Sequence, residues 1–289
     1  MISGISSNFT FHDQPPPRMS THSEIKRITT HILQEMKGRG EKISMLTAYD
    51  YSMARMVDAA GMDVILVGDS ASNVMAGHET TLPITLDQMI YHAAAVRRGA
   101  ARALVVVDMP FLTYQVSAER ALLNCGRVMQ EARCDAVKLE GGSPEIAATV
   151  RALGRAGVPV MGHLGFTPQS VNVLGTRVQG REAADAERLV EEARRLEAAG
   201  AFAVVLELVP AAVAARVREA VTIPTIGIGA GAECDGQVLV LHDLLGLTDG
   251  FSPKFLKRYA GMAADVRAAV SGFAADVRER RYPGAEHSF

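Results

Sequence analysis

The stretch Val64-Ile-Leu-Val-Gly-Asp-Ser70 decides the fold of this chain. It is a short apolar run, rich in β-branched residues, that stops at a glycine, an acid and a hydroxyl. A continuous apolar run of this length is typical of a strand buried on both faces of a parallel sheet. We therefore expect the chain to leave the sheet at Asp69.

Four other stretches repeat this pattern of an apolar run that ends in an ionisable residue. They are Leu104-Val-Val-Val-Asp108, Ala136-Val-Lys-Leu-Glu140, Val160-Met-Gly-His163 and Ala203-Val-Val-Leu-Glu207. In a parallel barrel the carboxyl ends of all strands face one rim, which carries the active site. Five such strand ends therefore indicate one shared site.

Strands alternate with helices along the chain. The expected strands are Ile43–Ala48, Val64–Gly68, Leu104–Asp108, Ala136–Glu140, Val158–His163, Ala203–Leu208, Thr225–Gly229 and Val238–His242. Helical spacing of apolar residues predicts helices over Glu24–Met36, Tyr51–Ala60, Leu86–Arg98, Ala118–Arg133, Pro144–Ala156, Glu182–Ala199, Pro210–Ala220 and Gly261–Arg280. Left-handed glycine caps are expected at Gly61, Gly99, Gly157 and Gly200.

Eight strands joined by crossover helices predict an α/β protein of the (β/α)8 TIM-barrel class. We expect a single catalytic domain over residues 24–289, opened by an N-terminal helix and preceded by a flexible, disordered extension over residues 1–23. A doubly wound open sheet is the alternative. It would usually carry Gly-x-Gly-x-x-Gly after the first strand, where this chain has Tyr49-Asp-Tyr-Ser52.

Composition excludes several classes of partner. The net charge of −2 gives no electrostatic footprint for nucleic acid or an anionic membrane. No apolar run reaches the roughly 20 residues that span a bilayer, and no signal core is evident. The three cysteines lack the close spacing of a zinc or redox motif. We expect reduced thiols and a cytoplasmic protein.

Asp69, Asp108 and Glu140 end three consecutive strands and are the candidate metal ligands. Neighbouring strands lie about 4.8 Å apart, so their acidic side chains can converge on one cation. Ligation by oxygen alone selects a hard divalent ion, of which Mg²⁺ is the expected one. The alternative is that each acid only caps the loop that follows it. Three acids on consecutive strands favour the metal site.

Three further residues are candidates for substrate binding or proton transfer. Lys138 is two residues before Glu140, so the two side chains point to the same face of the strand. Lys138 either holds an anionic substrate carboxylate or forms a structural ion pair. His163 either orients the substrate, carries a proton or is only packed. Glu207 ends a strand in apolar surroundings, which disfavour the charged carboxylate and so favour its use as a general base. Base and metal would then act on opposite ends of a 2-oxo acid.

Loops around this rim carry further signals. The glycines of Gly227-Ile-Gly-Ala-Gly231 either bind phosphate, let the backbone approach a ligand closely, or form a tight strand end. The long segments Ser70–Thr85 and Leu164–Arg181 are candidate lids that would exclude water from the site.

Many motifs, in order from about Ile25 to the C-terminus, resemble ketopantoate hydroxymethyltransferase. They are Leu46-Thr-Ala-Tyr-Asp50, Val67-Gly-Asp-Ser70, Gly77-His78, Thr81-Leu-Pro83, Tyr91-His92, Ala95-Val-Arg-Arg-Gly99, Lys138-Leu-Glu-Gly-Gly142, Gly162-His-Leu-Gly165, Thr167-Pro-Gln-Ser170, Val178-Gln-Gly180, Ile226-Gly-Ile-Gly-Ala-Gly231, Asp235-Gly-Gln237 and Glu286-His-Ser-Phe289. The resemblance implies a TIM barrel that transfers a hydroxymethyl group from 5,10-methylenetetrahydrofolate to 3-methyl-2-oxobutanoate, giving 2-dehydropantoate (ketopantoate) for pantothenate and coenzyme A synthesis.

The resemblance also assigns roles to individual positions. It implies Asp69 and Asp108 as Mg²⁺ ligands, with Glu140 near the metal directly or through water. It implies that Ser70, Asp108 and Lys138 hold the keto acid, with Asp69 beside it, that Glu207 is the proton acceptor and that His163 lies in the pocket. It also implies a homo-oligomer, a decamer of two pentameric rings. Two other functions remain open: a carbon-carbon lyase for a related acid, and a catalytically silent barrel that binds a ligand or acts as a scaffold.

Overall fold

The computed structural model describes residues 26–248, 250 and 252–289, so the expected extension over residues 1–23 lies outside the described residues. Eight parallel strands close into a barrel in the order β1 to β8, and β1 pairs with β8. A closed sheet excludes the doubly wound alternative, in which the sheet has two free edges. The (β/α)8 TIM barrel is therefore confirmed.

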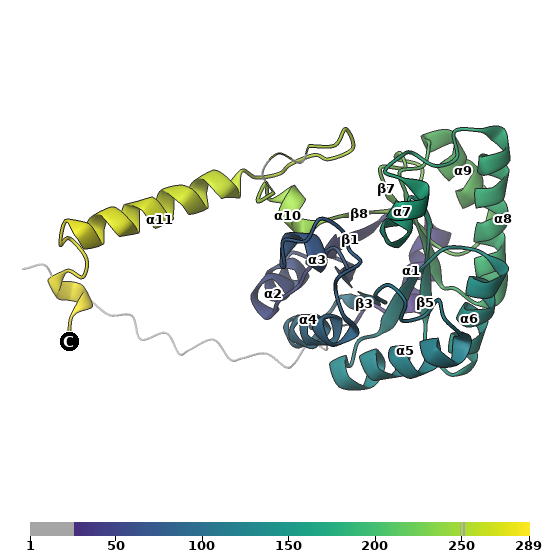
Figure 1. Ribbon diagram of the computed structural model, residues 1–289, viewed down its shortest axis with the longest axis horizontal. Helices are drawn as coiled ribbons and strands as arrows, with labels where there is room; N and C mark the ends of the chain where they lie inside the picture. Colours follow the sequence, from purple (N-terminus) through teal and green to yellow (C-terminus); the bar gives the residue numbers. More distant parts are fainter. Residues whose placement is uncertain (1–25, 249, 251) are drawn as a thin grey trace, which may run out of the picture.

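The strands are β1 (Ile43–Thr47), β2 (Val64–Val67), β3 (Leu104–Asp108), β4 (Ala136–Glu140), β5 (Val160–Gly165), β6 (Ala203–Glu207), β7 (Thr225–Ile228) and β8 (Gly236–Leu239). The helices are α1 (Thr30–Arg39), α2 (Tyr51–Ala59), α3 (Ala71–Val74), α4 (Leu86–Gly99), α5 (Ala118–Ala132), α6 (Pro144–Arg155), α7 (Val171–Leu174), α8 (Ala183–Ala199), α9 (Ala211–Ala220), α10 (Leu241–Leu244) and α11 (Met262–Arg278), with 3₁₀ turns η1 (Pro168–Ser170) and η2 (Ala285–His287). In Figure 1 helices α2, α4, α5, α6, α8 and α9 surround the sheet.

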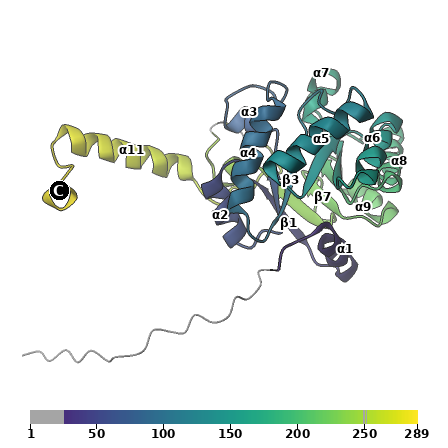
Figure 2. The same ribbon diagram turned by 90° about the horizontal axis from the view of Figure 1, so that it is seen from below.

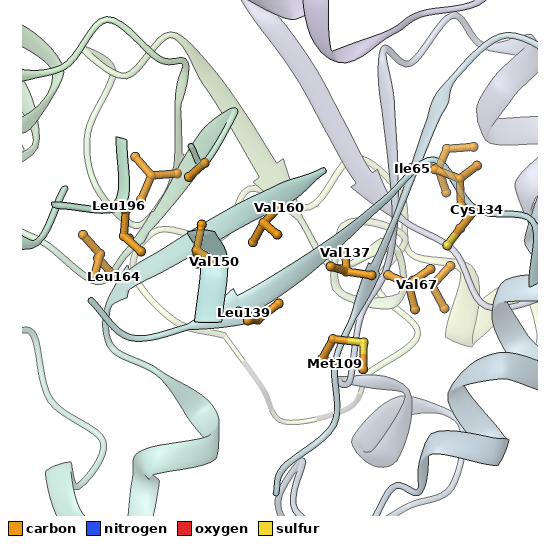
Figure 3. Close-up of a cluster of buried hydrophobic side chains, with 14 of the residues drawn as sticks. Ile65, Val67, Met109, Cys134, Val137, Leu139, Val150, Val160, Leu164 and Leu196 are labelled. Carbon is orange, nitrogen blue, oxygen red and sulfur yellow. The ribbon is translucent and has the colours of Figure 1, made fainter. Parts of the chain in front are cut away.

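Alternation along each strand divides the core into two layers. In β2, Val64 and Leu66 belong to a cluster inside the barrel, whereas Ile65 and Val67 belong to the layer between sheet and helices. Figure 3 shows part of that outer layer, in which Val137 of β4 lies near Val67. Because successive side chains of a strand point to opposite faces, this division fixes which residues can reach the barrel lumen.

Helix α1 closes the amino-terminal end of the barrel, below the strands in Figure 2. Its Leu33 and Met36 pack into the inner cluster. The expected start of this helix at Glu24 lies outside the described residues, but the described residues 26–29 are not helical, so the predicted helix began too early. The helix begins at Thr30, because Thr29 accepts a hydrogen bond from the Ile32 N–H, and the Ile28 N–H instead donates to a barrel loop at 2.8 Å.

Asp235 connects three elements at this closed end of the barrel through ion pairs and a hydrogen bond. Its carboxylate lies 3.1 Å from Lys37 Nζ of α1 and 2.7 Å from Arg218 Nε of α9, and it accepts from the Thr225 N–H of β7 at 3.0 Å. Burial by itself would raise the pKa of Asp235, but the Thr225, Arg218 and Lys37 donors outweigh it and lower that pKa. The group therefore contributes stability in its ionised form.

Two other expectations need correction. The last strand ends at Leu239, not at His242, because the Leu241 N–H donates to Thr47 Oγ1 at 2.9 Å and starts α10. Gly99 is not a left-handed cap but the last residue of α4. A Cβ on Gly99 would lie 2.6 Å from the Tyr51 carbonyl oxygen, so glycine is required there for the close packing of α2 on α4.

Helix α11 stands apart from the barrel in both views (Figures 1 and 2). None of its residues is buried. Val266, Val270 and Phe273 lie on one side of it at helical spacing, and their exposed fractions are 48%, 62% and 57%. The helix therefore presents a largely exposed apolar face, on which Phe273 contacts the ring of Tyr282. Among the described residues, no helix is long and apolar enough to cross a membrane.

Candidate active site

A cavity of about 450 Å³ opens at the carboxyl-terminal rim of the barrel. The seven residues selected from the sequence all line it: Asp69, Ser70, Asp108, Lys138, Glu140, His163 and Glu207. Both expected lid segments also border it, through Thr81 and Phe166 among others. Of the segment Gly227–Gly231, Ile228 lines the cavity.

Strand alternation explains why these side chains meet. Asp108 follows Leu104 and Val106 of the inner cluster at the same spacing of two, so it points into the lumen. Lys138 and Glu140 follow Ala136 of that cluster in the same way. The register of the sheet then sets Asp108 opposite Lys138. Lys138 and Glu140 do share one face, as the spacing predicted.

The acids form a cluster around a single ammonium group. Lys138 Nζ lies 2.9 Å from Asp108 Oδ1, and the Asp69 N–H donates to Asp108 Oδ2 at 3.1 Å. Burial by itself would lower the pKa of Lys138, but the charges of Asp108, Glu140 and Asp69 raise it above its ordinary value. Burial, together with the charges of Asp108 and Glu140, raises the pKa of Asp69. Negative charge therefore exceeds positive charge in the cluster when the acids are ionised.

His163 lies between the acid cluster and Glu207. Its Nδ1 is 3.2 Å from Lys138 Nζ and 3.5 Å from Glu140 Oε1, and its Nε2 is 3.2 Å from Glu207 Oε2. Burial and Lys138 lower the pKa of His163, but Glu140 and Glu207 outweigh them and the net shift is upward. His163 therefore lies within reach of both Glu140 and Glu207, the two carboxylates that raise its pKa.

Local structure holds the two ends of the cavity in place. Ser70 Oγ lies 2.8 Å from the hydroxyl of buried Tyr49, so the serine side chain is oriented from the end of β1. At the other end, Gly165 has φ of +93°, and a Cβ there would overlap the Glu207 carbonyl oxygen. Only glycine therefore lets the end of β5 lie this close to the strand that carries Glu207.

Sequence reasoning gave no role to Gln169 or Tyr114, which the structure places beside the acids. Gln169 Nε2 donates to Asp69 Oδ2 at 2.9 Å, and the Glu140 N–H donates to the Tyr114 hydroxyl at 3.0 Å. Gln169 belongs to the quoted motif Thr167-Pro-Gln-Ser170. A polar side chain in a loop after a strand was the available signal, and it is a weak one.

The donor set is compatible with a hard cation. Asp108 Oδ1 is buried and accepts no hydrogen bond; its partner is the Lys138 ammonium, 2.9 Å away in an ion pair. Carboxylate oxygens are the ligands that a hard divalent cation prefers. Over the described part of the chain, no three or more His, Cys, Asp or Glu side chains form a group that could hold a metal ion.

Solved structures of other proteins share the fold. The chain superimposes on phosphoenolpyruvate phosphomutase from Streptomyces platensis subsp. rosaceus with a TM-score of 0.60 at 15% identity, over 87% of this chain and 88% of that one. It superimposes on 2,3-dimethylmalate lyase, a member of the PEP mutase/isocitrate lyase superfamily, with a TM-score of 0.56 at 15% identity, over 86% and 98%. At these identities the likeness shows the fold alone.

Sequence relatives are much closer. The chain is 57% identical over 265 residues to a 3-methyl-2-oxobutanoate hydroxymethyltransferase from Parabacteroides distasonis, covering 91% of this chain and 97% of that protein. It is 56% identical over 274 residues to the enzyme of the same name from Porphyromonas gingivalis, covering 94% and 100%. Residues 27–285 match the family model described as ketopantoate hydroxymethyltransferase. The chain therefore belongs to the ketopantoate hydroxymethyltransferase family.

Proposed function

We propose that the chain transfers a hydroxymethyl group from 5,10-methylenetetrahydrofolate to 3-methyl-2-oxobutanoate and forms 2-dehydropantoate for pantothenate synthesis. One observation carries the proposal: an acid cluster and a separate glutamate, Glu207, line the same cavity at the active rim of the barrel. Membership of the family supports the choice of substrate.

Mg²⁺ is the proposed metal, and Asp69 and Asp108 would hold it. Glu140 would assist directly or through water. One of its oxygens, Oε2, already accepts a hydrogen bond from the Gln169 N–H at 3.0 Å. The remaining ligands would come from substrate and solvent. When bound, the ion withdraws electrons from the carbonyl group of the keto acid and makes the hydrogen on C3 more acidic.

Glu207 is the proposed proton acceptor. Its carboxylate takes the proton from C3, and His163, whose Nε2 lies 3.2 Å from Glu207 Oε2, would orient that carboxylate. Lys138 and Ser70 would hold the substrate carboxylate. C3 then forms a bond to the one-carbon unit. Water supplies the hydroxyl oxygen of the product, and tetrahydrofolate leaves.

A homo-oligomer, with a decamer as the expected state, is part of the proposal. The exposed apolar side of α11, formed by Val266, Val270 and Phe273, supports it, because a helix of this kind is stable when its apolar face is covered. A cytoplasmic location is proposed as well. It is supported by Cys125, Cys134 and Cys234, which are all free and buried.

The deciding experiment measures formation of 2-dehydropantoate from the keto acid. We expect product only when methylenetetrahydrofolate is present, loss of product on addition of a chelator, and recovery on addition of excess Mg²⁺. Cleavage of a related 2-oxo or 2-hydroxy acid without folate would instead indicate a carbon-carbon lyase. A protein that forms no product under any of these conditions would contradict the proposal and favour the silent barrel.

A further inference from the structure

Gln169 is buried in the η1 turn that follows β5, and its side chain makes four hydrogen bonds. Nε2 donates to Asp69 Oδ2 at 2.9 Å and to the Met109 carbonyl at 2.9 Å. Oε1 accepts from the Tyr114 hydroxyl at 3.0 Å and from the Gln115 amide at 2.8 Å. An amide side chain has two N–H donors and one oxygen with two lone pairs. Every donor and acceptor position of the Gln169 side chain is therefore used within the protein.

These partners fix the direction of the amide. The Met109 carbonyl can only accept, so the nitrogen of Gln169 must face it. The second N–H of the same group then points to Asp69 Oδ2. The flipped amide would place its oxygen against a carbonyl oxygen and a carboxylate oxygen, and both contacts are repulsive. Asp69 Oδ2 is thus held by the protein, which leaves Oδ1 for a ligand in the cavity.

The main chain of Gln169 holds a second acid of the cluster. Its N–H donates to Glu140 Oε2 at 3.0 Å. The third acid, Asp108, is held through Oδ2 by the N–H of Asp69. Each of the three carboxylates therefore has one oxygen bound to an N–H group. Two of those three N–H groups belong to Gln169, although Gln169 is separated from Asp69 by 100 positions in the sequence.

We propose that Gln169 is a positioning residue whose hydrogen bonds orient Asp69 and Glu140. The geometry of the acid cluster then depends on where the loop after β5 lies. This rests on the proposed function, in which that cluster holds a divalent cation and the keto acid. Residues that orient a metal ligand through a hydrogen bond typically change metal affinity by about 10–100-fold when they are replaced.

The test replaces Gln169 by an apolar side chain of similar length, Gln169→Met, and measures Mn²⁺ affinity by electron paramagnetic resonance together with keto acid turnover. The matched control is Gln179→Met. Gln179 is also a buried glutamine in the segment that follows β5, with 5% exposure, but its Nε2 donates to the Arg177 carbonyl. We expect the Mn²⁺ dissociation constant to rise at least about tenfold for Gln169→Met and to stay within about twofold for Gln179→Met.

A second variant distinguishes the loss of these hydrogen bonds from misfolding of the protein. Gln169→Asn keeps the polar amide but is one methylene shorter, so it cannot reach Asp69 and Met109 together, and we expect the same loss of Mn²⁺ affinity. A folded Gln169 variant with wild-type Mn²⁺ affinity and kcat/KM would overturn the inference, as would an equal loss in the Gln179 control. If the wild-type protein bound neither Mn²⁺ nor keto acid, the proposed function and this inference would both be wrong. If the wild-type protein is active and the Gln169 variant is unaffected, only the inference about Gln169 is refuted and the proposed function stands.

Discussion

Glu207→Gln is the substitution that probes the chemistry most directly, because glutamine keeps the shape of the side chain and removes its ability to take a proton. The Glu207 side chain is 19% exposed, and its Oε2 lies 3.2 Å from His163 Nε2. A positioned general base typically contributes about 10²–10⁴ in rate. At about 1.36 kcal/mol per factor of ten, this corresponds to roughly 3–5 kcal/mol of transition-state stabilisation.

The nearest alternative base does not compensate for this loss. Glu140 lies on the other side of the His163 ring, 3.5 Å from Nδ1, and one of its oxygens is bound to the Gln169 N–H. It belongs to the acid cluster, which would act on the carbonyl end of the substrate. We therefore expect the variant to lose at least about a hundredfold in rate.

Exchange of the C3 hydrogen of 3-methyl-2-oxobutanoate with deuterated water, followed by proton NMR, isolates this step because no folate is needed. Glu79→Gln is the matched control: Glu79 also lines the cavity but is exposed and lies in the segment after β2. The control should exchange within about twofold of the wild-type rate, since it removes a carboxylate without removing the base. Exchange at the wild-type rate in Glu207→Gln would refute the assignment of the base.

Three further outcomes are expected. Calorimetry should show that Mg²⁺ and the keto acid bind cooperatively, and Asp69→Ala or Asp108→Ala should abolish the effect; additive binding in the wild-type protein would contradict the shared site. Light scattering after size exclusion should show that Phe273→Asp forms a smaller assembly, because a charge on the apolar face of α11 opposes its burial; an unchanged mass would remove α11 from the interface. Asp235→Ala should lower the free energy of unfolding by about 1–3 kcal/mol in urea, because it leaves the buried N–H and hydroxyl of Thr225 without this acceptor. Since the folded-state pKa of Asp235 is lowered, its contribution is present above the unfolded-state pKa of about 4 and is lost as the pH falls through the folded-state pKa, so wild type and variant should converge in acid.

The barrel could be predicted because its strands are buried on both faces. A run such as Val64-Ile-Leu-Val67 is apolar at every position, and the pattern recurs often enough to count the strands. The predictions failed where tertiary contacts set the ends of elements. Ile28 has an apolar side chain at helical spacing, yet its N–H is bound to the Arg102 carbonyl, and no local pattern indicates that partner.

The meeting of these acids at one cavity could be predicted because each lies at the end of a strand, and the fold brings strand ends together. Gln169 could not be assigned a role, since neither its residue type nor its place in a loop marks it. Its partners lie in the turn after β2, on β4 and in the loop after β3, and their positions depend on the closed sheet. The residues that hold a site in shape are therefore harder to find than the residues that form it.

The position of an acid relative to its strand separates stabilising acids from site acids in this barrel. Asp63, Asp135 and Asp235 each come one residue before a strand, and each pairs with an arginine and accepts a backbone N–H from the neighbouring strand. The three acids at the opposite rim share the single ammonium of Lys138, which lies 2.9 Å from Asp108 Oδ1. Three ionised carboxylates with one cation among them keep a net negative charge, so a further cation would stabilise them more than it would stabilise an acid that has its own arginine. The same residue type therefore stabilises one end of the barrel and, under the proposed function, is available for chemistry at the other.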